Sequence, residues 1–190
     1  TTLKEGDKVL DTHETTFGIR SLALDNVDGL QMNGKTLKLR GACIHHDNGV
    51  IGAATLQSAE ERRVRILKEA GFNAIRSAHH PAGRALLKAC DKLGMLVMDE
   101  AFDIWTNEKT PWDYAIDFPK WWEQDIEAMV RKDYNHPSVI LYSIGNEITE
   151  TGNSHGTNWS RKLVSKIRSL DDTRFIINCI NGLLSAHGQI

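Results

Sequence analysis

Apolar runs and amphipathic stretches alternate along the chain from residue 37 onward. Apolar residues gather at consecutive or alternating positions in five short segments, at 37–44, 73–77, 95–98, 139–144 and 174–178. The run at 139–144, Val-Ile-Leu-Tyr-Ser-Ile, has the composition of a strand that is buried on both faces. We therefore predict five strands in this part of the chain.

Between these segments, apolar residues recur at helical spacing, which predicts helices over 58–70, 82–93, 118–135 and 157–170. Ser58 and Glu61 form a capping-box pattern at the start of the first helix. Gly71 and Gly94 follow the first two helices as C-terminal caps, and Pro137 ends the third because the residue before a proline avoids the helical region. Alternating strands and helices predict a parallel sheet.

Two architectures fit this alternation, a doubly wound sheet and part of a (β/α)₈ barrel. A complete barrel needs about 250 residues, so this chain of 190 residues would hold roughly five of its eight units. No glycine-rich phosphate-binding pattern follows the first strand, which disfavours nucleotide binding. The chain starts differently, because 16–24 has strand character and Asn33-Gly34 suits a two-residue hairpin turn. This start is predicted to be all-β.

Composition and charge argue mainly against certain classes of binding partner. The formal net charge is −2 and both signs are interleaved, which disfavours nucleic acid or an anionic membrane as partner. No apolar stretch reaches about 18 residues, so no membrane span is expected. Cys43, Cys90 and Cys179 form neither a disulfide framework nor a zinc motif, and they favour a reducing, cytoplasmic compartment, with a secreted or periplasmic one left open.

Polar side chains gather where the predicted strands end. They are His45-His46 after the first strand, Arg76 and His79-His80 at the second, Asp99-Glu100 with Asp103 and Trp105 at the third, and Asn146-Glu147 at the fourth. The opposite strand ends carry no such cluster. In parallel α/β folds the carboxyl ends of the strands carry the active site, so this asymmetry predicts an enzyme site.

Each of these side chains also has a structural interpretation. The histidine pairs could lie in surface loops, and Asp99 could cap the next segment or pair with Arg76. Trp105 could belong to the core or stack on a substrate ring. Glu147 fits an ion-pair role less well, because a carboxylate at the end of a buried strand is costly unless it is paired or used.

Two chemistries suit the cluster. The first is metal-assisted hydrolysis, with ligands drawn from His45, His46, His79, His80 and Asp99. This reading is weakened because adjacent histidines on an extended segment point apart. The second is glycoside hydrolysis, which uses two carboxylic acids. Glu147 suits the general acid, Asn146 suits a hydrogen bond to the sugar 2-hydroxyl, and a sugar-binding or structural module remains the non-enzyme alternative.

Four stretches, together with the lead-in TFGIRSLAL at 16–24, resemble family 2 glycoside hydrolases, the β-galactosidase and β-glucuronidase group. They are residues 37–49, 71–81, 90–103 and 131–147, and the pattern NHPSV-x5-GNE in the last is the most specific. The resemblance implies an α/β fold with about five βα units of a (β/α)₈ TIM barrel at 37–190. It also implies that residues 1–36 are the end of a preceding immunoglobulin-like β-sandwich domain and a linker.

The resemblance further implies a retaining β-glycosidase acting on β-glycosides such as oligosaccharides. A β-galactosidase-like enzyme is favoured by HHDNG at 45–49, with β-glucuronidase and β-mannosidase as alternatives. The acid/base maps onto Glu147. The nucleophile is expected after a later strand, beyond Ile190, so the piece alone is expected to be inactive.

The substrate-binding residues expected on this basis are Asn146, His45, His79, Arg76, Asp99 and Trp105. No cofactor is expected. Some members of the family hold magnesium with a Glu-x-His that follows Asp-Glu-Ala, and the corresponding stretch here, AFDIWTN, lacks that histidine, so no metal is expected. Five βα units would leave open strand edges, which predicts self-association.

Overall fold

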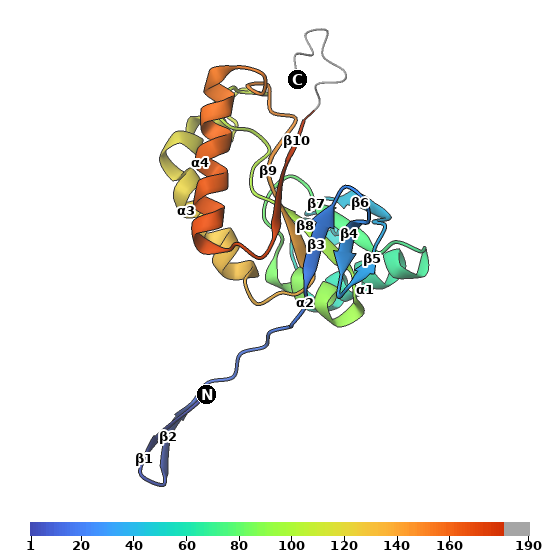
Figure 1. Ribbon diagram of the computed structural model, residues 1–190, viewed down its shortest axis with the longest axis vertical. Coiled ribbons are helices and arrows are strands. Elements are labelled where there is room, and N and C mark those ends of the chain that lie inside the picture. The colour runs from blue at the N-terminus through green and yellow to red at the C-terminus, as the bar shows by residue number, and fades with distance from the viewer. Residues whose placement is uncertain (181–190) are drawn as a thin grey trace.

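Five parallel strands form the central sheet of the computed structural model, which describes residues 1–180 (Figure 1). The strands are β6 (Gly41–Ile44), β7 (Ala74–Ser77), β8 (Leu96–Glu100), β9 (Val139–Asn146) and β10 (Phe175–Cys179). Their spatial order, β10-β9-β8-β7-β6, follows the chain without a reversal. A doubly wound sheet would reverse its order at a switch point, so the structure confirms the partial barrel. Residues 181–190 of the predicted barrel domain lie outside the described range.

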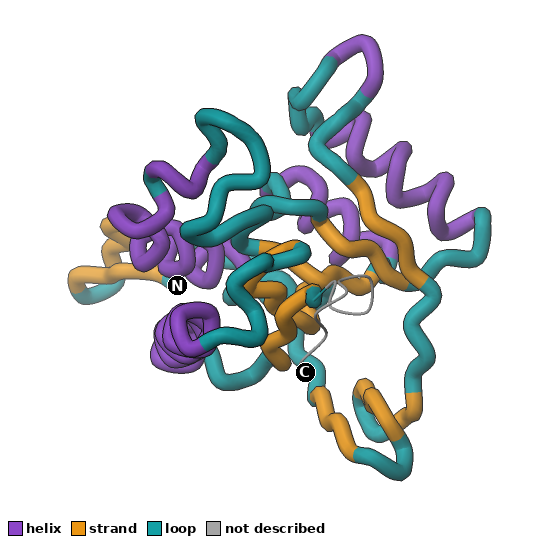
Figure 2. Tube along the Cα trace, turned by 90° about the horizontal axis from the view of Figure 1, so that it is seen from above, coloured by secondary structure: helices purple, strands orange, loops and turns teal. Residues whose placement is uncertain are grey.

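Four helices connect the strands and cover the outer face of the sheet. They are α1 (Gln57–Glu69), α2 (Arg84–Leu93), α3 (Phe118–Asp133) and α4 (Ser154–Leu170), with short 3₁₀ turns η1 (Gly49–Ile51) and η2 (Tyr114–Ile116). Seen from above, the helices form an arc outside the strands (Figure 2). Within residues 1–180, none of these helices is long and apolar enough to cross a bilayer.

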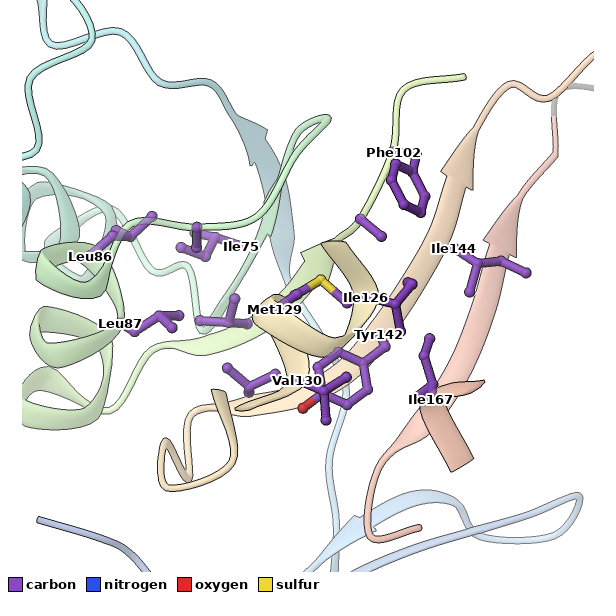
Figure 3. Close-up of a cluster of buried hydrophobic side chains, with 14 of the residues drawn as sticks. Ile75, Leu86, Leu87, Phe102, Ile126, Met129, Val130, Tyr142, Ile144 and Ile167 are labelled. Carbon is purple, nitrogen blue, oxygen red and sulfur yellow. The ribbon is translucent and has the colours of Figure 1, made fainter. Parts of the chain in front are cut away.

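The main core lies between the sheet and the helices. Ile75 of β7 packs near Leu86 and Leu87 of α2, and Tyr142 and Ile144 of β9 pack with residues of α3 and α4 (Figure 3). Tyr142 and Ile144 are two residues apart on β9, as expected when every second side chain points outward to the helices. The side chains between them point to the inside of the barrel, which positions the candidate site.

Two small antiparallel sheets precede the barrel strands. One is the hairpin of β1 (Thr2–Glu5) and β2 (Lys8–Thr12), which extends away from the rest of the chain in Figure 1. The other contains β3 (Leu22–Asp25), β4 (Gly29–Met32) and β5 (Lys35–Thr36). The hairpin turn predicted at Asn33-Gly34 is confirmed, because both residues have the positive φ, 52° and 74°, that a type I′ turn requires.

The three-stranded sheet covers the amino ends of the barrel strands. Leu30 and Met32 pack on a buried cluster formed by Ala74, Leu96 and Ile140. This leaves the carboxyl ends of the strands, at the opposite edge, as the accessible end. The predicted domain boundary after residue 36 and the preceding sandwich domain stay predictions.

Three local predictions were wrong. Of the segment 16–24, which was predicted to have strand character, only 22–24 belongs to a strand, because β3 begins at Leu22. The strand predicted at 37–44 begins only at Gly41, because the side chain of Asn73 bonds the backbone before it, accepting from Arg40 N at 2.7 Å and donating to Lys38 O at 2.9 Å. The capping box does not form, since α1 begins at Gln57, ahead of Ser58, and no side chain caps it.

The described sheet ends at β6 on one side and β10 on the other. A closed barrel would pair both strands with further strands. Self-association through these edges stays a prediction.

Candidate active site

Arg76 and Glu100 form the centre of a polar network at the carboxyl edge of the sheet. Arg76 lies opposite Met98 in the β7–β8 register, so Glu100, two residues further along β8, faces the same side of the sheet. The guanidinium donates from Nε to Glu100 Oε2 at 3.0 Å and from Nη2 to Oε2 at 2.7 Å. Burial would lower the pKa of Arg76, but the hydrogen bonds and charge of Glu100 outweigh burial and raise it.

The carboxylate of Glu100 is fully buried, with 0% of its surface exposed. Besides Arg76, it has Ser143 Oγ at 2.6 Å and His79 Nδ1 at 2.8 Å as partners. An ionised carboxylate only accepts hydrogen bonds, so a proton on Nδ1 of His79 satisfies this contact. The other ring nitrogen of His79 is then left for a substrate.

His45, at the end of β6, lies beside His79. Their ring centroids are 5.2 Å apart in an edge-to-face arrangement, and His45 is exposed. His80 lies in a second pair, 4.6 Å from His46 between ring centroids. Burial, followed by the positive charges of the neighbouring histidines, lowers the pKa of His80, which favours its neutral form.

The amide of Asn146, at the end of β9, is held from both sides. Its Oδ1 accepts from Arg76 Nη2 at 2.8 Å, and its Nδ2 donates to Asp103 Oδ1 at 2.8 Å. These two bonds fix which end of the amide is oxygen and which is nitrogen. Nδ2 carries a second hydrogen, and 7% of the surface of Asn146 remains exposed.

Glu147 follows Asn146 directly and is exposed at the strand end. Its φ of +47° is in the left-handed region, which is uncommon for a residue other than glycine. Its backbone N–H donates to Cys179 O at 2.7 Å. The chain approaches Trp105 closely just before this point, because a Cβ on Gly145 would lie 3.0 Å from Trp105 Nε1. The chain bends at Glu147, directly after β9.

The loop after β8 adds Asp103 and Lys109 to the site. Lys109 Nζ donates to Asp103 Oδ1 at 2.8 Å, to Asp103 O at 2.7 Å and to Asn146 O at 2.7 Å. Burial would raise the pKa of Asp103, but the hydrogen bonds from Lys109 and Asn146 outweigh it and lower the pKa below its ordinary value. Asp103 is therefore an anion at neutral pH.

The structure contradicts two predicted substrate contacts, Asp99 and Trp105, both of which have 0% of their surface exposed. The pleat of β8 turns Asp99 away from Glu100, and it bonds Ala82 N at 2.7 Å and Lys132 Nζ at 3.1 Å. Trp105 lies under the end of β9 and donates from Nε1 to Ile144 O at 2.8 Å. Their roles are structural.

The position of Asp99 also removes the carboxylate from the metal-ligand set considered above. Both of its oxygens already have protein partners, Ala82 N on Oδ1 and Lys132 Nζ on Oδ2. Across residues 1–180, no three His, Cys, Asp or Glu side chains are arranged to hold a metal ion. Arg76, His45, His79 and Asn146 do come together, next to Glu147. Glu100 and Asp103, which the sequence placed in the polar cluster without a separate role, also belong to the site. Ser143 and Lys109, which the sequence did not single out, complete it.

Glu150 anchors the loop that carries Lys109. It is 2% exposed, and its Oε1 accepts from Thr106 N, Thr106 Oγ1 and Asn107 N, each at 2.8 Å. Burial would raise the pKa of Glu150, but the hydrogen bonds from Thr106 and Asn107 outweigh it and lower the pKa. The ionised form of Glu150 therefore stabilises the folded loop.

Acid should weaken this anchor. The pKa of Glu150 is lower in the folded than in the unfolded chain, so the unfolded state binds more protons as the pH falls. We expect the thermal transition of the full-length protein to fall from about pH 5 downward. Glu150→Gln should lower the transition temperature at neutral pH and reduce this acid dependence. Glu108→Gln, at an exposed position of the same loop, should leave the neutral value unchanged. An equal acid dependence in Glu150→Gln and the unmodified protein would contradict this role.

Parallel strands in sequential order, with a polar network at their carboxyl edge, define this chain as part of a (β/α)₈ barrel of the enzyme type. Residues 23–187 match the family model of glycosyl hydrolases family 2, TIM barrel domain. The chain belongs to this family.

Relatives agree with this assignment. The chain is 42% identical over 178 residues to "Beta-galactosidase BoGH2A" of Bacteroides ovatus, covering 94% of the chain and 20% of that protein. It is 39% identical over 148 residues to a "Putative beta-glucuronidase" of Formosa agariphila, covering 77% of the chain and 14% of that protein. A solved family 2 member from Bacteroides cellulosilyticus superposes with a TM-score of 0.91 at 47% identity, covering 94% of the chain and 23% of that protein. The chain thus spans about a fifth of the length of these relatives.

Proposed function

We propose that the full-length protein is a retaining β-glycosidase with Glu147 as its general acid and base. The proposal is supported mainly by the network of Arg76, Glu100 and Asn146. This network lies directly before Glu147, at the exposed carboxyl edge of a family 2 barrel. A site of this kind fits glycoside hydrolysis because the reaction needs a carboxylic acid beside fixed hydrogen-bond donors.

In the first step, a carboxylate attacks the anomeric carbon of the sugar while Glu147 donates its proton to the departing oxygen. The bond from the anomeric carbon to that oxygen breaks, and an alcohol leaves. The attacking group must be a second carboxylate about 5–5.5 Å from Glu147. Glu100 does not suit this role, because it is buried and bonded to Arg76, His79 and Ser143. Asp103 does not suit it either, because its Oδ1 is bonded to Lys109 and Asn146. We therefore place the nucleophile outside residues 1–180.

In the second step, ionised Glu147 takes a proton from water, and the water oxygen displaces the carboxylate from the anomeric carbon. Glu147 is then protonated again and ready for the next cycle, as microscopic reversibility requires. Two successive inversions give a product with the β configuration of the substrate. Asn146 Nδ2 would donate to the sugar 2-hydroxyl, and His45 and His79 would contact other hydroxyls.

For the sugar, we propose a neutral β-glycoside, with a β-galactoside first and a β-glucuronide or β-mannoside as alternatives. The two cations described in the site, Arg76 and Lys109, are paired with Glu100 and Asp103. A uronate would need a cation from elsewhere in the protein. The relative named β-galactosidase is also the more similar of the two reported above, at 42% against 39% identity.

The proposal predicts hydrolysis of aryl β-galactosides by the full-length protein, with the β-anomer of the free sugar appearing first by NMR. Aryl β-glucuronides and β-mannosides should be turned over more slowly. Initial release of the α-anomer would contradict a retaining mechanism. Binding of galactose without turnover would instead indicate a carbohydrate-binding module. Loss of activity with a chelator, restored by added metal, would favour the metal-assisted alternative.

A further inference from the structure

The peptide group between Asn146 and Glu147 is held at both of its polar atoms. Its carbonyl oxygen, Asn146 O, accepts from Lys109 Nζ at 2.7 Å. Its N–H, on Glu147, donates to Cys179 O at 2.7 Å. Because a peptide group is planar, these two bonds fix the orientation of the whole group. They therefore fix the direction in which the chain enters Glu147.

This orientation matters because of the backbone conformation that follows. Glu147 has a φ of +47°, which an L-residue with a side chain adopts only where the surroundings impose it. The nearest alternative is a rotation of this peptide group, which would aim the Glu147 side chain elsewhere. Lys109 supplies the side-chain contact that opposes such a rotation at the carbonyl end.

Lys109 is itself fixed in place. An ammonium group has three donors, and those of Lys109 meet Asp103 O, Asp103 Oδ1 and Asn146 O at 2.7–2.8 Å. The side chain is one-quarter exposed. Its backbone N–H donates to Asp113 Oδ2 at 2.8 Å, which fixes the base of the side chain.

Asp103 closes the arrangement into a ring. The same Oδ1 that accepts from Lys109 also accepts from Asn146 Nδ2 at 2.8 Å. Lys109 is therefore connected to Asn146 directly, at its carbonyl oxygen, and indirectly, through Asp103, at its side-chain amide. Hydrogen bonds from a charged donor are stronger than neutral ones, so a neutral side chain in place of Lys109 would hold the ring less firmly.

We infer that Lys109 is a positioning residue, which holds the Asn146–Glu147 peptide so that the carboxyl group of Glu147 faces the leaving-group oxygen. This inference rests on the proposed function of Glu147. Lys109 does not touch the substrate in this account. It acts through the direction of the strand end, so its loss should impair proton donation more than sugar binding.

The test compares two substrates in the full-length protein, phenyl β-galactoside, whose leaving group needs a proton, and dinitrophenyl β-galactoside, whose leaving group does not. For Lys109→Met we expect kcat/KM to fall on the order of 10²-fold with the first substrate, and about ten times less with the second, since general acid catalysis contributes roughly 10²–10⁴-fold. Lys68→Met is the matched control, because Lys68 also bonds a loop carbonyl, Gly94 O at 3.1 Å, in the segment leading into β8. It should change neither value.

An equal loss with both substrates would show a merely structural role for Lys109 and overturn the inference, as would no loss at all.

If Lys109→Met does not fold, Lys109→Arg is measured in its place. Arginine keeps the charge, but its planar group cannot point three donors at the same three oxygens, so a smaller difference between the two substrates is expected, and its absence would overturn the inference. Glu147→Gln is measured in parallel. A difference between substrates in Glu147→Gln without one in the Lys109 variants rejects Lys109 alone, whereas its absence in Glu147→Gln rejects the proposed function.

Discussion

Arg76→Met should destabilise the barrel domain by about 3–5 kcal/mol, because breaking a buried ion pair leaves an uncompensated charge. That charge is Glu100, which has 0% of its surface exposed and would keep the neutral Ser143 and His79 Nδ1 as partners. Asn146 would also lose the donor on its Oδ1. The expected result is a lower midpoint of urea denaturation in the full-length protein, with little remaining activity.

Two further variants test whether the loss of stability comes from breaking the buried ion pair or from removing any arginine. Arg131→Met breaks an exposed pair with Glu127 on α3, which should cost no more than about 0.5 kcal/mol. Adding Glu100→Gln to Arg76→Met removes the uncompensated charge and should restore part of the stability. A midpoint for Arg76→Met equal to that of Arg131→Met would contradict the central position given to this pair.

Glu147→Gln should lower kcat/KM for phenyl β-galactoside on the order of 10³-fold, because glutamine cannot donate the proton that a poor leaving group needs. Dinitrophenyl β-galactoside leaves as a stable anion, so its first step should fall by less than about ten-fold. The fold should be unaffected, since the side chain is exposed. Thermal denaturation provides that control, and an equal loss with both substrates would remove Glu147 from the acid role.

Much of this fold could be predicted from periodicity. The run at 139–144 and the amphipathic segments gave the βα alternation, and the sequential strand order then distinguished the barrel from the doubly wound sheet. The strand predicted from residue 37 failed because a side chain distant in sequence, Asn73, bonds the backbone of 38–40. Local pattern contains no information about such a partner.

The site was predictable where residues sit at strand ends and less so elsewhere. Asp99 and Glu100 are adjacent carboxylates, and only the pleat and register of β8 decide that Glu100 faces Arg76. Trp105 has the loop position of a sugar-stacking residue, yet it is buried against Ile144. No sequence pattern around Lys109 indicated its role, because that role depends on how the loop after β8 folds back onto Asn146.

The configuration of the product formed from azide tests the assignment of Glu147 most directly. In Glu147→Ala, dinitrophenyl β-galactoside still forms the covalent intermediate, but no base activates water to release it. Azide is already an anion and needs no base. It should displace the carboxylate with inversion, restore turnover and give the β-galactosyl azide.

An α-galactosyl azide would contradict this assignment, because it arises when azide replaces a missing nucleophile and displaces the leaving group directly. Release of free sugar at the unmodified rate, with no azide product, would show that Glu147 takes no part in either step. The predicted result, seen by NMR of the purified product, is the β-azide alone.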